Sequence, residues 1–556
     1  MKDFKRIIAS GSAFVLAASA LAGCGLSRKP IDLNSETPSI EIMTTANKTG
    51  SPGQSSPVIQ AIEKHLGEKM SEKYGKNYEK VILDIKWVMS TAYAEKVTAA
   101  LGANEYPNVM LVTARNSAII QNSRHGTFWD ITDAFTKKDE KYVSDENPEG
   151  YAYPNLAQAN PVINKNISVD GRVSGVYRAR TIGRQGMTYR KDWVTNLHKR
   201  GVLGFDEPKT IDDLDAMVKS FTEDDPDGDG NKNTYGMIVT TYLDGPLGNL
   251  AIWMGAPNGW GYDEKTGEWK PAFMSQGYLD AMNKMREWYQ KGYINQNMAT
   301  MSANDWDGEF LNGYGGIQID VADRARRNAG NIKDKNPNAV VDVIGYVTKD
   351  ADTEPKTWPT SGHMGYYVMP HQTVETEEEL DFILSVLDEC NGETVVDLCN
   401  YGIEGIHYTL DANGKAEKKT EEELTKDYQD LNQFSMGILP HYELRTAYTN
   451  EVAAKVEEVY LDNENWAVNN PMEPYTSDAY AMSGTQMDAI IGEAKTNYIT
   501  GKIDENAFKA AIEQWLKMDG RIVCAEYTKA YEDDKSNYDE DGNLVIKDEY
   551  KFDFKF

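Results

Sequence analysis

The sequence predicts an α/β protein whose first part contains a largely parallel sheet. Three short apolar segments, at 40–45, 81–88 and 108–112, are expected to be strands. Between them, a segment that starts near Pro57 and another at 93–101 repeat their apolar residues with the period of a helix. Strands that are apolar on both faces and alternate with helices are typical of a sheet covered by helices on each side. The fold class is therefore α/β.

The remainder of the chain is longer and more helical. A strand is expected at 173–177, and a strand that leads into a helix at 186–193. Further helices are expected to follow the N-cap residues Thr210, Ser275, Thr376 and Asp504. The two threonines precede an acidic residue by three positions, which is the pattern of a capping box. Near the C-terminus, residues 539–556 are expected to form a hairpin.

The first 23 residues have the composition of a secretory signal peptide. Basic residues are followed by an apolar run, 7–22, which is too short to span a bilayer as a stable helix. The run ends in Leu21-Ala-Gly-Cys24, which resembles the lipobox of bacterial lipoproteins, so Cys24 is expected to carry lipid. An ordinary signal peptide with an incidental cysteine is the alternative. Residues 24–39 are polar and contain two prolines, which favours a flexible tether.

Length and charge narrow the class of protein. About 530 residues remain after the signal peptide, which is enough for two or more hydrophobic cores. The formal net charge of −29 repels nucleic acid and anionic lipid headgroups, so neither is an expected partner. No second long apolar run follows, so lipid on Cys24 is the expected membrane attachment. Cys390, Cys399 and Cys524 are expected to be buried free thiols, and a bond between the first two is the alternative.

A calcium loop is the most specific motif in the chain. Positions 1, 3, 5, 7 and 9 of an EF-hand-like loop are filled by Asp225, Asp227, Asp229, Asn231 and Asn233. Position 7 would bind through its backbone carbonyl, and Gly230 at position 6 permits the sharp turn. Position 12 is Gly236 in place of a bidentate glutamate, so we expect weak binding of a structural Ca²⁺ ion. The alternative is an acidic turn without a metal.

Tryptophans near Gly, Pro or Asn are expected to lie in loops and to stack on sugar rings. These residues are Trp253, Trp260, Trp306 and Trp358. Flat amphipathic rings beside polar side chains suit sugars, whose C–H faces stack while their hydroxyls form hydrogen bonds. For any one of them, burial in the core is at least as good an interpretation. Tryptophans in helical patterns are assigned to packing, namely Trp193, Trp288 and Trp515.

Three arginines close together stand out in so acidic a chain. Arg178, Arg180 and Arg184 follow Tyr177 within seven residues. Either they pair with local carboxylates, or some of them face a cleft and bind an anionic group of a ligand in bidentate fashion. The second interpretation gives the narrower hypothesis that a bound sugar is acidic.

Enzyme signatures are largely missing from the sequence. It contains no Gly-x-Ser-x-Gly, His-Glu-x-x-His, phosphate-loop or dinucleotide motif. Its 87 acidic residues supply many candidate pairs for glycoside hydrolysis, but no feature singles out one pair. We therefore expect a protein that is not an enzyme.

Together these stretches resemble the large, family 1 extracellular solute-binding lipoproteins of oligosaccharide ABC importers, including alginate-oligosaccharide-binding proteins. The resemblance covers most of the chain after the signal peptide. It rests on the lipobox-like residues 21–24, the loop 225–236 and the segments 189–193, 208–213, 255–260, 401–408 and 499–504. In that family the residue after position 9 of the loop is often Glu, whereas here it is Thr234.

The resemblance implies a two-lobe periplasmic-binding-protein-like fold of type II, with a hinge and a cleft between the lobes. By analogy, residues 40–178 and 361–405 would form lobe one, and residues 179–360 and 406–556 would form lobe two. The residues implied at the cleft or at the crossings between lobes are Tyr177, Arg178, Arg180, Trp358, Tyr401 and His407.

The resemblance also implies a function. The protein would be a lipid-anchored monomer on the extracellular face of the cell membrane that captures an oligosaccharide and delivers it unaltered to an ABC permease. Two alternatives stay open. One is the same fold binding a peptide or a non-sugar anion, and the other is an exported enzyme that acts on glycosides.

Overall fold

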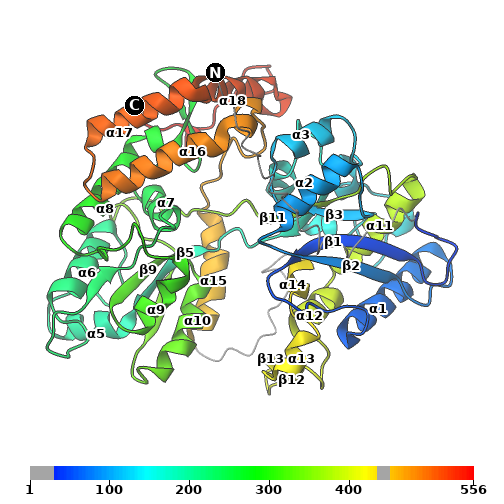
Figure 1. Ribbon diagram of the computed structural model, residues 1–556, viewed down its shortest axis with the longest axis horizontal. Helices are drawn as coiled ribbons and strands as arrows, with labels where there is room; N and C mark the ends of the chain where they lie inside the picture. Colours follow the sequence, from blue (N-terminus) through cyan, green and yellow to red (C-terminus); the bar gives the residue numbers. More distant parts are fainter. Residues whose placement is uncertain (1–29, 435–450) are drawn as a thin grey trace, which may run out of the picture.

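The computed structural model describes residues 30–434 and 451–556, and these form two α/β lobes that lie side by side (Figure 1). The first lobe, at the right of Figure 1, contains the blue N-terminal strands. The second lobe, at the left, contains the green segments and the orange C-terminal helices. Each lobe has a sheet and a hydrophobic core of its own.

The sheet of the first lobe has five strands in the order β2-β1-β3-β11-β4. Their bounds are β1 Ser39–Ala46, β2 Ile82–Met89, β3 Val109–Val112, β4 Gly175–Ala179 and β11 His363–Val368. Strand β1 pairs in parallel with β2 and β3, whereas β11 is antiparallel to β3 and β4. Because β11 follows the first part of the second lobe in sequence, its insertion between β3 and β4 returns the chain to the first lobe.

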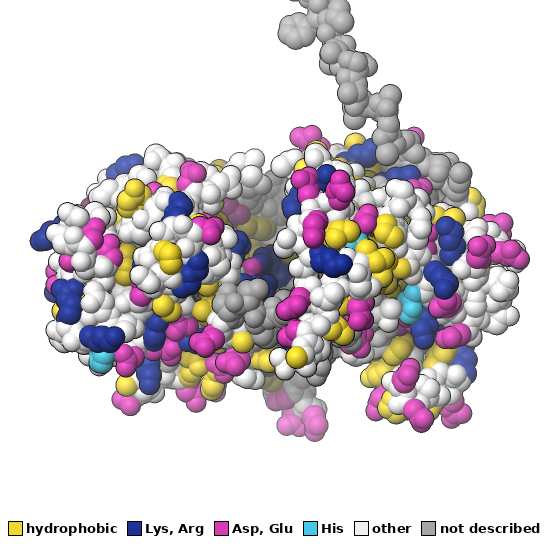
Figure 2. Space-filling model, turned by 90° about the horizontal axis from the view of Figure 1, so that it is seen from below, with side chains coloured by type: hydrophobic (Ala, Val, Ile, Leu, Met, Phe, Trp, Pro, Cys, Tyr) yellow, Lys and Arg dark blue, Asp and Glu magenta, His cyan; other side chains and the backbone are white. Residues whose placement is uncertain are grey.

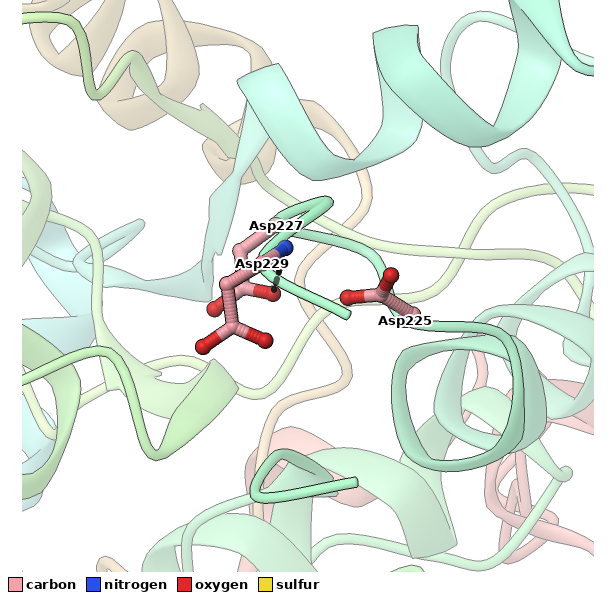
Figure 3. A group of neighbouring side chains, drawn as sticks. All are labelled: Asp225, Asp227 and Asp229. Carbon is pink, nitrogen blue, oxygen red and sulfur yellow. Dashed lines mark hydrogen bonds between the residues drawn. The ribbon is translucent and has the colours of Figure 1, made fainter. Parts of the chain in front are cut away.

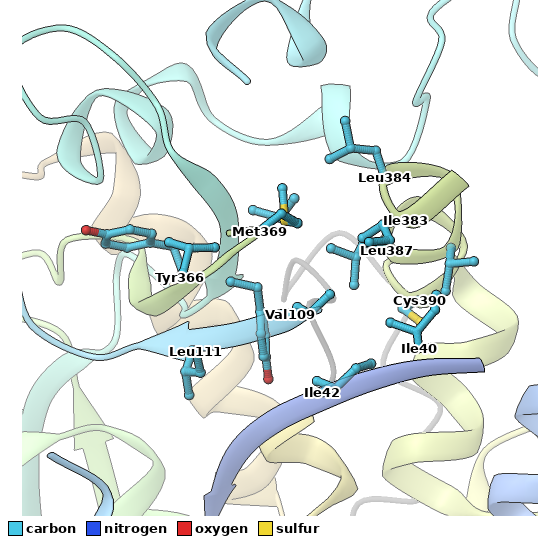
Figure 4. Close-up of a cluster of buried hydrophobic side chains, with 14 of the residues drawn as sticks. Ile40, Ile42, Val109, Leu111, Tyr366, Met369, Ile383, Leu384, Leu387 and Cys390 are labelled. Carbon is cyan, nitrogen blue, oxygen red and sulfur yellow. The ribbon is translucent and has the colours of Figure 1, made fainter. Parts of the chain in front are cut away.

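Helices cover this sheet and bury its apolar residues. They are α1 Pro57–Tyr74, α2 Tyr93–Ala103, α3 Ser117–Arg124, α4 Pro161–Asn166, α11 Glu377–Cys390 and α12 Glu393–Tyr401. Figure 4 shows Ile383 and Leu387 of α11 beside Ile40 of β1 and Val109 of β3. All four side chains are almost fully buried, which is why the strands are apolar on both faces.

The second lobe is built on a mixed sheet in the order β10-β5-β9-β6. Its strands are β5 Gln185–Arg190, β6 Tyr235–Met237, β9 Gly315–Val321 and β10 Val341–Ile344. Strand β5 is antiparallel to both of its neighbours, and β6 is parallel to β9. A separate hairpin joins β7 Trp260–Asp263 to β8 Glu268–Pro271.

The helices of the second lobe fall into two groups in sequence. Those before β11 are α5 Lys191–Lys199, α6 Ile211–Glu223, α7 Asp244–Trp253, α8 Gln276–Gln290, α9 Trp306–Leu311 and α10 Asp323–Asn331. Those after it are α15 Glu451–Asn465, α16 Asp478–Ile499, α17 Glu505–Trp515 and α18 Arg521–Asp533. The capping boxes at Thr210 and Thr376 are both present, so these predicted helix starts are confirmed.

Two crossing segments, 180–184 and 357–362, join the lobes and bond to each other. The Arg180 amide donates to the Gly362 carbonyl at 2.9 Å, and the Thr360 amide donates to the Ile182 carbonyl at 2.9 Å. Helix α15 packs on the first crossing, where a Cβ at Gly183 would lie 2.3 Å from the Tyr460 carbonyl oxygen. A side chain at 183 would therefore push α15 away from the hinge.

The structure corrects two predicted boundaries. Residues 406–434, expected in the second lobe, contain β12 Tyr408–Leu410, β13 Ala416–Lys418, α13 Glu422–Lys426 and α14 Leu431–Phe434. Helix α14 contacts β1 and α12, and Leu431 is buried in the first core. Residues 30–39 were expected in a tether, but Ile31 is buried and Leu33 packs on the same core. Both segments thus belong to the first lobe.

The sequence also predicts features of the two chain ends and of the cysteines. The predicted C-terminal hairpin is present only as a turn: an antiparallel bridge joins Tyr538 to Leu544, further isolated bridges join Lys551 to Tyr262 and Phe554 to Ser275, and residues 539–556 form no regular strands. Cys390, Cys399 and Cys524 are buried and free, as predicted. The predicted signal peptide and Cys24 lie outside the described residues. None of the described helices combines the length and the apolar character needed to cross a bilayer.

Candidate functional site

Two adjoining cavities lie between the lobes at the hinge. The first, of about 370 Å³, is lined by both crossings, and the second, of about 580 Å³, extends toward the C-terminal helices. They share the lining residues Asn258, Trp358, Asn470 and Glu473. Figure 2 shows the molecule hollowed between its two lobes. We refer to the two together as the cleft, and to the smaller as its hinge end and the larger as its aromatic end.

The aromatic end is lined by rings that the second lobe supplies. They are Trp260, Phe273, Tyr278, Tyr480, Trp515 and Tyr527. The Trp260 and Tyr527 rings meet edge to face with centroids 4.7 Å apart. The Phe273 and Trp515 rings do the same at 5.3 Å. Because these four rings are held in pairs, this wall offers rigid apolar faces of the kind that sugar rings stack on.

Trp358 separates the two ends of the cleft and is held in place by its surroundings. It follows Thr357 on the second crossing, and its Nε1 donates to Asn258 Oδ1 at 3.1 Å. Its six-membered ring lies against α7, where a Cβ at Gly248 would approach it to 2.7 Å. The missing side chain at Gly248 is therefore what allows the indole to lie flat on this helix.

Carboxylates give the aromatic end its polarity. Asp488 accepts a hydrogen bond from the Tyr480 hydroxyl at 2.7 Å, and burial raises the pKa of Asp488 above its usual value. Asp244 pairs with Lys495. Arg115, from the first lobe, is the cation on this wall, and its Nη groups donate to the carbonyls of Ser168 and Glu473.

The hinge end is richer in hydrogen-bond donors. Arg180 and His363 line it together with several amide side chains. The Arg180 Nε and the His363 Nε2 are buried, and neither has a hydrogen-bond partner among the described residues. Glu473 also lines this end, and its two oxygens accept hydrogen bonds from Ser361 Oγ at 3.0 Å and Asn470 Nδ2 at 3.1 Å.

A third cavity, of about 950 Å³, also lies between the lobes but has a different character. It is bordered by α3 and α4 on one side and by α16 and α18 on the other. Phe135 and Tyr475 are the aromatic residues that line it within the described chain, and lysines and aspartates make up much of the rest. It is larger than either part of the cleft, but it lacks the ring-lined wall and does not touch the crossings. We therefore place the candidate site in the cleft.

The predicted calcium loop has the geometry of a cation site. Asp225, Asp227 and Asp229 each bring a carboxylate oxygen within 4.8 Å of the others (Figure 3). Asp225 Oδ1 is buried, and no described residue donates a hydrogen bond to it. Burial and the neighbouring carboxylates raise the pKa of Asp227. A cation at this point would satisfy the orphaned oxygen and relieve the repulsion, so these residues fit Ca²⁺.

The two asparagines of the loop contribute in another way. The Asn231 amide donates to Asp229 Oδ1 at 2.7 Å, and Asn233 Nδ2 donates to Asp229 Oδ2 at 3.1 Å. These bonds lower the pKa of Asp229 and orient its carboxylate. Their role as metal ligands stays a prediction.

Comparison with known proteins decides the family. The chain is 32% identical over 536 residues to lipoprotein LipO of Bacillus subtilis, covering 94% of this chain and 98% of LipO. It is 34% identical over 467 residues to the polygalacturonan/rhamnogalacturonan-binding protein YtcQ of the same organism, covering 82% of this chain and 86% of YtcQ. The chain belongs to the family 1 extracellular solute-binding proteins. No family model matches it.

Solved structures support the fold of this solute-binding protein. An HMO-binding, ABC-transporter-associated solute-binding protein from Bifidobacterium longum infantis superposes with a TM-score of 0.62, at 15% identity, over 90% of this chain and 99% of that one. The alginate-binding protein AlgQ2 superposes with a TM-score of 0.60, at 17% identity, over 91% of this chain and 100% of that one. At such low identity these matches show the fold, and the predicted two-lobe, type II fold is confirmed.

The structure of the solute-binding protein brings three of the predicted ligand residues to the cleft. Arg180 lines the hinge end, Trp260 lines the aromatic end, and Trp358 lines both. Their contact with a ligand stays a prediction.

Four other predicted residues lie in the lobe cores. Tyr177 is fully buried, and its hydroxyl bonds to the Leu156 carbonyl and Asn391. Arg178 is buried in the first lobe and donates to Thr45 and Gln433. Trp253 and Trp306 are buried in the second lobe. Each of these side chains faces protein rather than the cleft, which corrects the expectation that they contact ligand.

The remaining two predicted residues lie away from the cleft on the first lobe. Tyr401 packs with Tyr408 in a small cluster of its own beside β12 and β13. His407 is fully buried, and its Nδ1 accepts a hydrogen bond from the Ile403 amide at 2.9 Å. They were expected near a third crossing, but the chain makes a local β-hairpin there.

Sequence reasoning missed most of the aromatic end. Tyr278, Tyr480 and Tyr527 lie on helices, and Trp515 was assigned to packing. Trp515 is 1% exposed, yet it forms part of the cleft wall, so it both packs in the core and lines the cleft. The available signal was the run of tyrosines on the faces of α8, α16 and α18, which helical periodicity alone assigns to a core.

Proposed function

We propose that this protein captures an oligosaccharide in the cleft, leaves it chemically unaltered and delivers it to the permease of an ABC importer. The observation that supports this most is the cleft itself, in which two lobes joined by a hinge enclose a ring-lined wall and a donor-rich end. A ligand that touches both lobes favours the closed form through contacts that the open form lacks. The permease would then recognise the closed form.

A binding screen tests this function directly. Pectic oligosaccharides come first, because YtcQ is named for binding polygalacturonan and rhamnogalacturonan. A ligand at about 100 times its dissociation constant stabilises the folded state by about 2.7 kcal/mol, which shifts the melting midpoint. A library of neutral and acidic oligosaccharides that gives no shift, while a peptide library does, would show that the same fold serves another solute.

Recovery of the ligand separates binding from catalysis. After incubation with the protein, a bound oligosaccharide should be eluted by denaturation and show its original length in chromatography. Shortened products would support the alternative, an exported glycosidase that uses the cleft carboxylates as acid and nucleophile. The same preparation should run as a monomer in size-exclusion chromatography.

Two further parts of the proposal concern the loop and the anchor. Ca²⁺ bound by Asp225, Asp227 and Asp229 would brace the loop between α6 and β6. Lipid on Cys24 would hold the protein on the extracellular face of the membrane. Mass spectrometry of the membrane fraction tests the lipid, and replacement of Cys24 by Ser should release the protein into the medium.

A further inference from the structure

The two ends of the cleft differ in the charge that they offer a ligand. Among the described residues that line the hinge end, Arg180 is the one cation and Glu473 the one carboxylate. The aromatic end carries Asp244, Asp488 and Glu473 against the single cation Arg115. A ligand that spans the cleft therefore meets a donor-rich environment at one end and an acidic one at the other.

Arg180 is placed to receive an anion. Its backbone is fixed by the bond to the Gly362 carbonyl, so the side chain starts from the hinge itself. The neighbouring Arg184 is already paired with Asp323 through two bonds of 3.0 and 3.1 Å. Burial and Arg184 lower the pKa of Arg180, which means that its charge is poorly compensated. An anion in the cavity would supply that compensation.

His363 offers a second donor to the same cavity. Its Nδ1 accepts a hydrogen bond from the Gly365 amide at 3.1 Å, so the ring proton of the neutral imidazole lies on Nε2. Burial, with a contribution from Arg115, lowers the pKa of His363 to about 4, so the ring is neutral at pH 7. The Nε2–H is thus a fixed donor, and no described residue accepts its hydrogen bond.

Among the described contacts, Glu473 is paired with neither Arg180 nor His363. Both of its oxygens already accept hydrogen bonds, from Ser361 and Asn470, which hold the carboxylate in a fixed place. The amide side chains of Asn166, Asn258 and Asn469 also line the hinge end; Asn166 and Asn258 each donate one N–H to a backbone carbonyl and keep a second N–H. Besides these amides, this end therefore keeps two buried, uncommitted N–H groups for a ligand, one of them on a cation.

The aromatic end would reject a second carboxylate. Asp244 and Asp488 both line it; Asp244 is paired with Lys495, whereas Asp488 accepts a hydrogen bond from the neutral Tyr480 hydroxyl and is the carboxylate that repels a second anion. The two Nη groups of Arg115 are engaged by backbone carbonyls and bind no carboxylate there. Rings and carboxylate acceptors together suit the C–H faces and hydroxyl groups of a neutral sugar.

Building on the proposed function, we propose that the ligand is a mixed oligosaccharide, in which Arg180 and His363 bind the carboxylate of a uronic acid and the aromatic end binds a neutral sugar next to it. One bond from the Arg180 Nε–H, with a neighbouring Nη–H completing a bidentate pair, and one bond from the imidazole would use both uncommitted donors. The cleft would thereby discriminate against chains made only of uronic acids as well as against wholly neutral ones.

Titration calorimetry with three matched ligands tests this. The first is a tetrasaccharide of alternating galacturonate and rhamnose, the second is the same molecule with its carboxylates reduced to alcohols, and the third is tetragalacturonate. We expect the first to bind about ten- to a hundredfold more tightly than the second, the range of a charge-assisted hydrogen bond. We expect it to bind more tightly than the third also. Equal affinity for the first two, or the tightest binding by tetragalacturonate, would overturn the inference.

Variants assign the effect to the hinge end. Arg180→Gln should weaken the acidic tetrasaccharide about ten- to a hundredfold and leave the reduced one unchanged, and Arg180→Lys should restore part of the loss. His363→Gln, which keeps a donor, should weaken it less than His363→Leu. Arg521→Gln is the matched control, because Arg521 is exposed on α18 and does not line the cleft. A melting curve for each variant verifies that it is folded.

The outcomes also separate the inference from the proposed function. If Arg180→Gln weakens the acidic and reduced ligands equally, Arg180 supports the cleft without binding the carboxylate, and the inference is wrong. If the protein binds neutral oligosaccharides and none of the acidic ones, the inference fails while the proposed function stands. If it binds no oligosaccharide of either kind, both fail.

Discussion

The two lobes contribute different chemistry to the cleft. The second lobe supplies the aromatic rings, of which Trp260 and Tyr527 form an edge-to-face pair. The first lobe, with the crossing that leads into it, supplies polar side chains such as Arg115, Asn166 and His363. Apolar contact does not depend strongly on orientation, whereas hydrogen bonds do. Under the proposed function, the second lobe would hold a sugar in the open form, and the first lobe would add directional bonds when the lobes close.

The core of the first lobe buries a carboxyl group, that of Asp388, and its titration gives the largest expected effect, a pH dependence of stability. Asp388 in α11 is 4% exposed and accepts a hydrogen bond from the Leu156 amide at 2.8 Å. Burial raises the pKa of Asp388 to about 7, with Glu389 adding to the rise and Lys73 opposing it. The folded state therefore holds a proton that the unfolded state releases near pH 4, so stability falls as pH rises from about 4 to about 7.

The variant Asp388→Asn isolates this contribution. The pKa of Asp388 differs between the folded and unfolded states, and each unit of difference corresponds to about 1.36 kcal/mol. The titration of Asp388 therefore changes the free energy of unfolding by about 4 kcal/mol at most. We expect urea denaturation to show the variant gaining stability relative to the parent protein between pH 5 and pH 8. The difference between the two proteins removes the other titrations, including that of His363, whose lowered pKa acts in the opposite sense. A difference that does not change with pH would contradict the prediction.

The second lobe supplies the aromatic rings of the cleft wall, and this difference between the lobes predicts the next largest effect, a loss of ligand affinity. Trp260→Ala removes a ring from the cleft wall and should weaken oligosaccharide binding about a hundredfold, the loss expected for a central aromatic contact. Trp129→Ala is the matched control on the first lobe, where the half-buried indole donates to the Val374 carbonyl at 2.8 Å outside the cleft. It should change the melting temperature but not the affinity. Similar losses of affinity in both variants would remove the distinction between the lobes.

The sequence predicted the local elements of the fold well and the lobe boundaries less well. The strands 40–45 and 108–112 and the helix after Thr376 depend on neighbouring residues alone, through apolar runs and a capping box, and the structure confirms them. Residues 406–434 return to the first lobe because Leu431 fills a gap in its core. The burial of Leu431 depends on tertiary packing, and no local sequence pattern predicts it.

The site residues were harder to predict for a related reason. Trp306 and Trp260 have similar neighbours in sequence, rich in Gly, Asn and Asp. Only the fold shows that Trp306 is buried, with its Nε1 donating to the Ile238 carbonyl at 3.1 Å, while Trp260 reaches the cleft. The three arginines show the same limit: Arg180 lines the cleft, whereas Arg184 finds Asp323. The carboxylate triplet was easier, because one short loop contains all of it.

The calcium loop belongs to the second lobe and gives a smaller predicted effect. With a dissociation constant of about 0.1 mM, 1 mM Ca²⁺ would stabilise the folded state by about 1.4 kcal/mol. Calorimetric melting should therefore show a higher transition with Ca²⁺ than with a chelator, and the same concentration of Mg²⁺ should not reproduce it. Asp227→Asn should abolish the difference. A parent protein that melts identically with and without Ca²⁺ would show that the loop is an acidic turn.

An ion pair between the lobes gives the smallest predicted effect and tests whether closure contributes to affinity. Arg124 on α3 donates to Asp478 of α16 at 2.6 Å and to Asp170 at 2.7 Å, and it holds the pKa of Asp170 below its usual value. The pair is partly exposed, so it should be worth about 1 kcal/mol or less, and Arg124→Gln should weaken ligand binding about fivefold at most.

The radius of gyration shows whether the loss of ligand affinity in Arg124→Gln comes from weaker closure of the lobes. Arg124 does not line the cleft, so it can act on affinity only through the balance between open and closed forms. Small-angle scattering should show a larger radius of gyration for ligand-free Arg124→Gln than for the parent protein, and the difference should shrink in high salt because screening already weakens the parent's pair. Arg521→Gln, whose partner Glu513 lies in the same lobe, should change neither quantity. A loss of affinity without a change in radius would contradict this assignment, because Arg124 would then affect affinity by a route other than lobe closure.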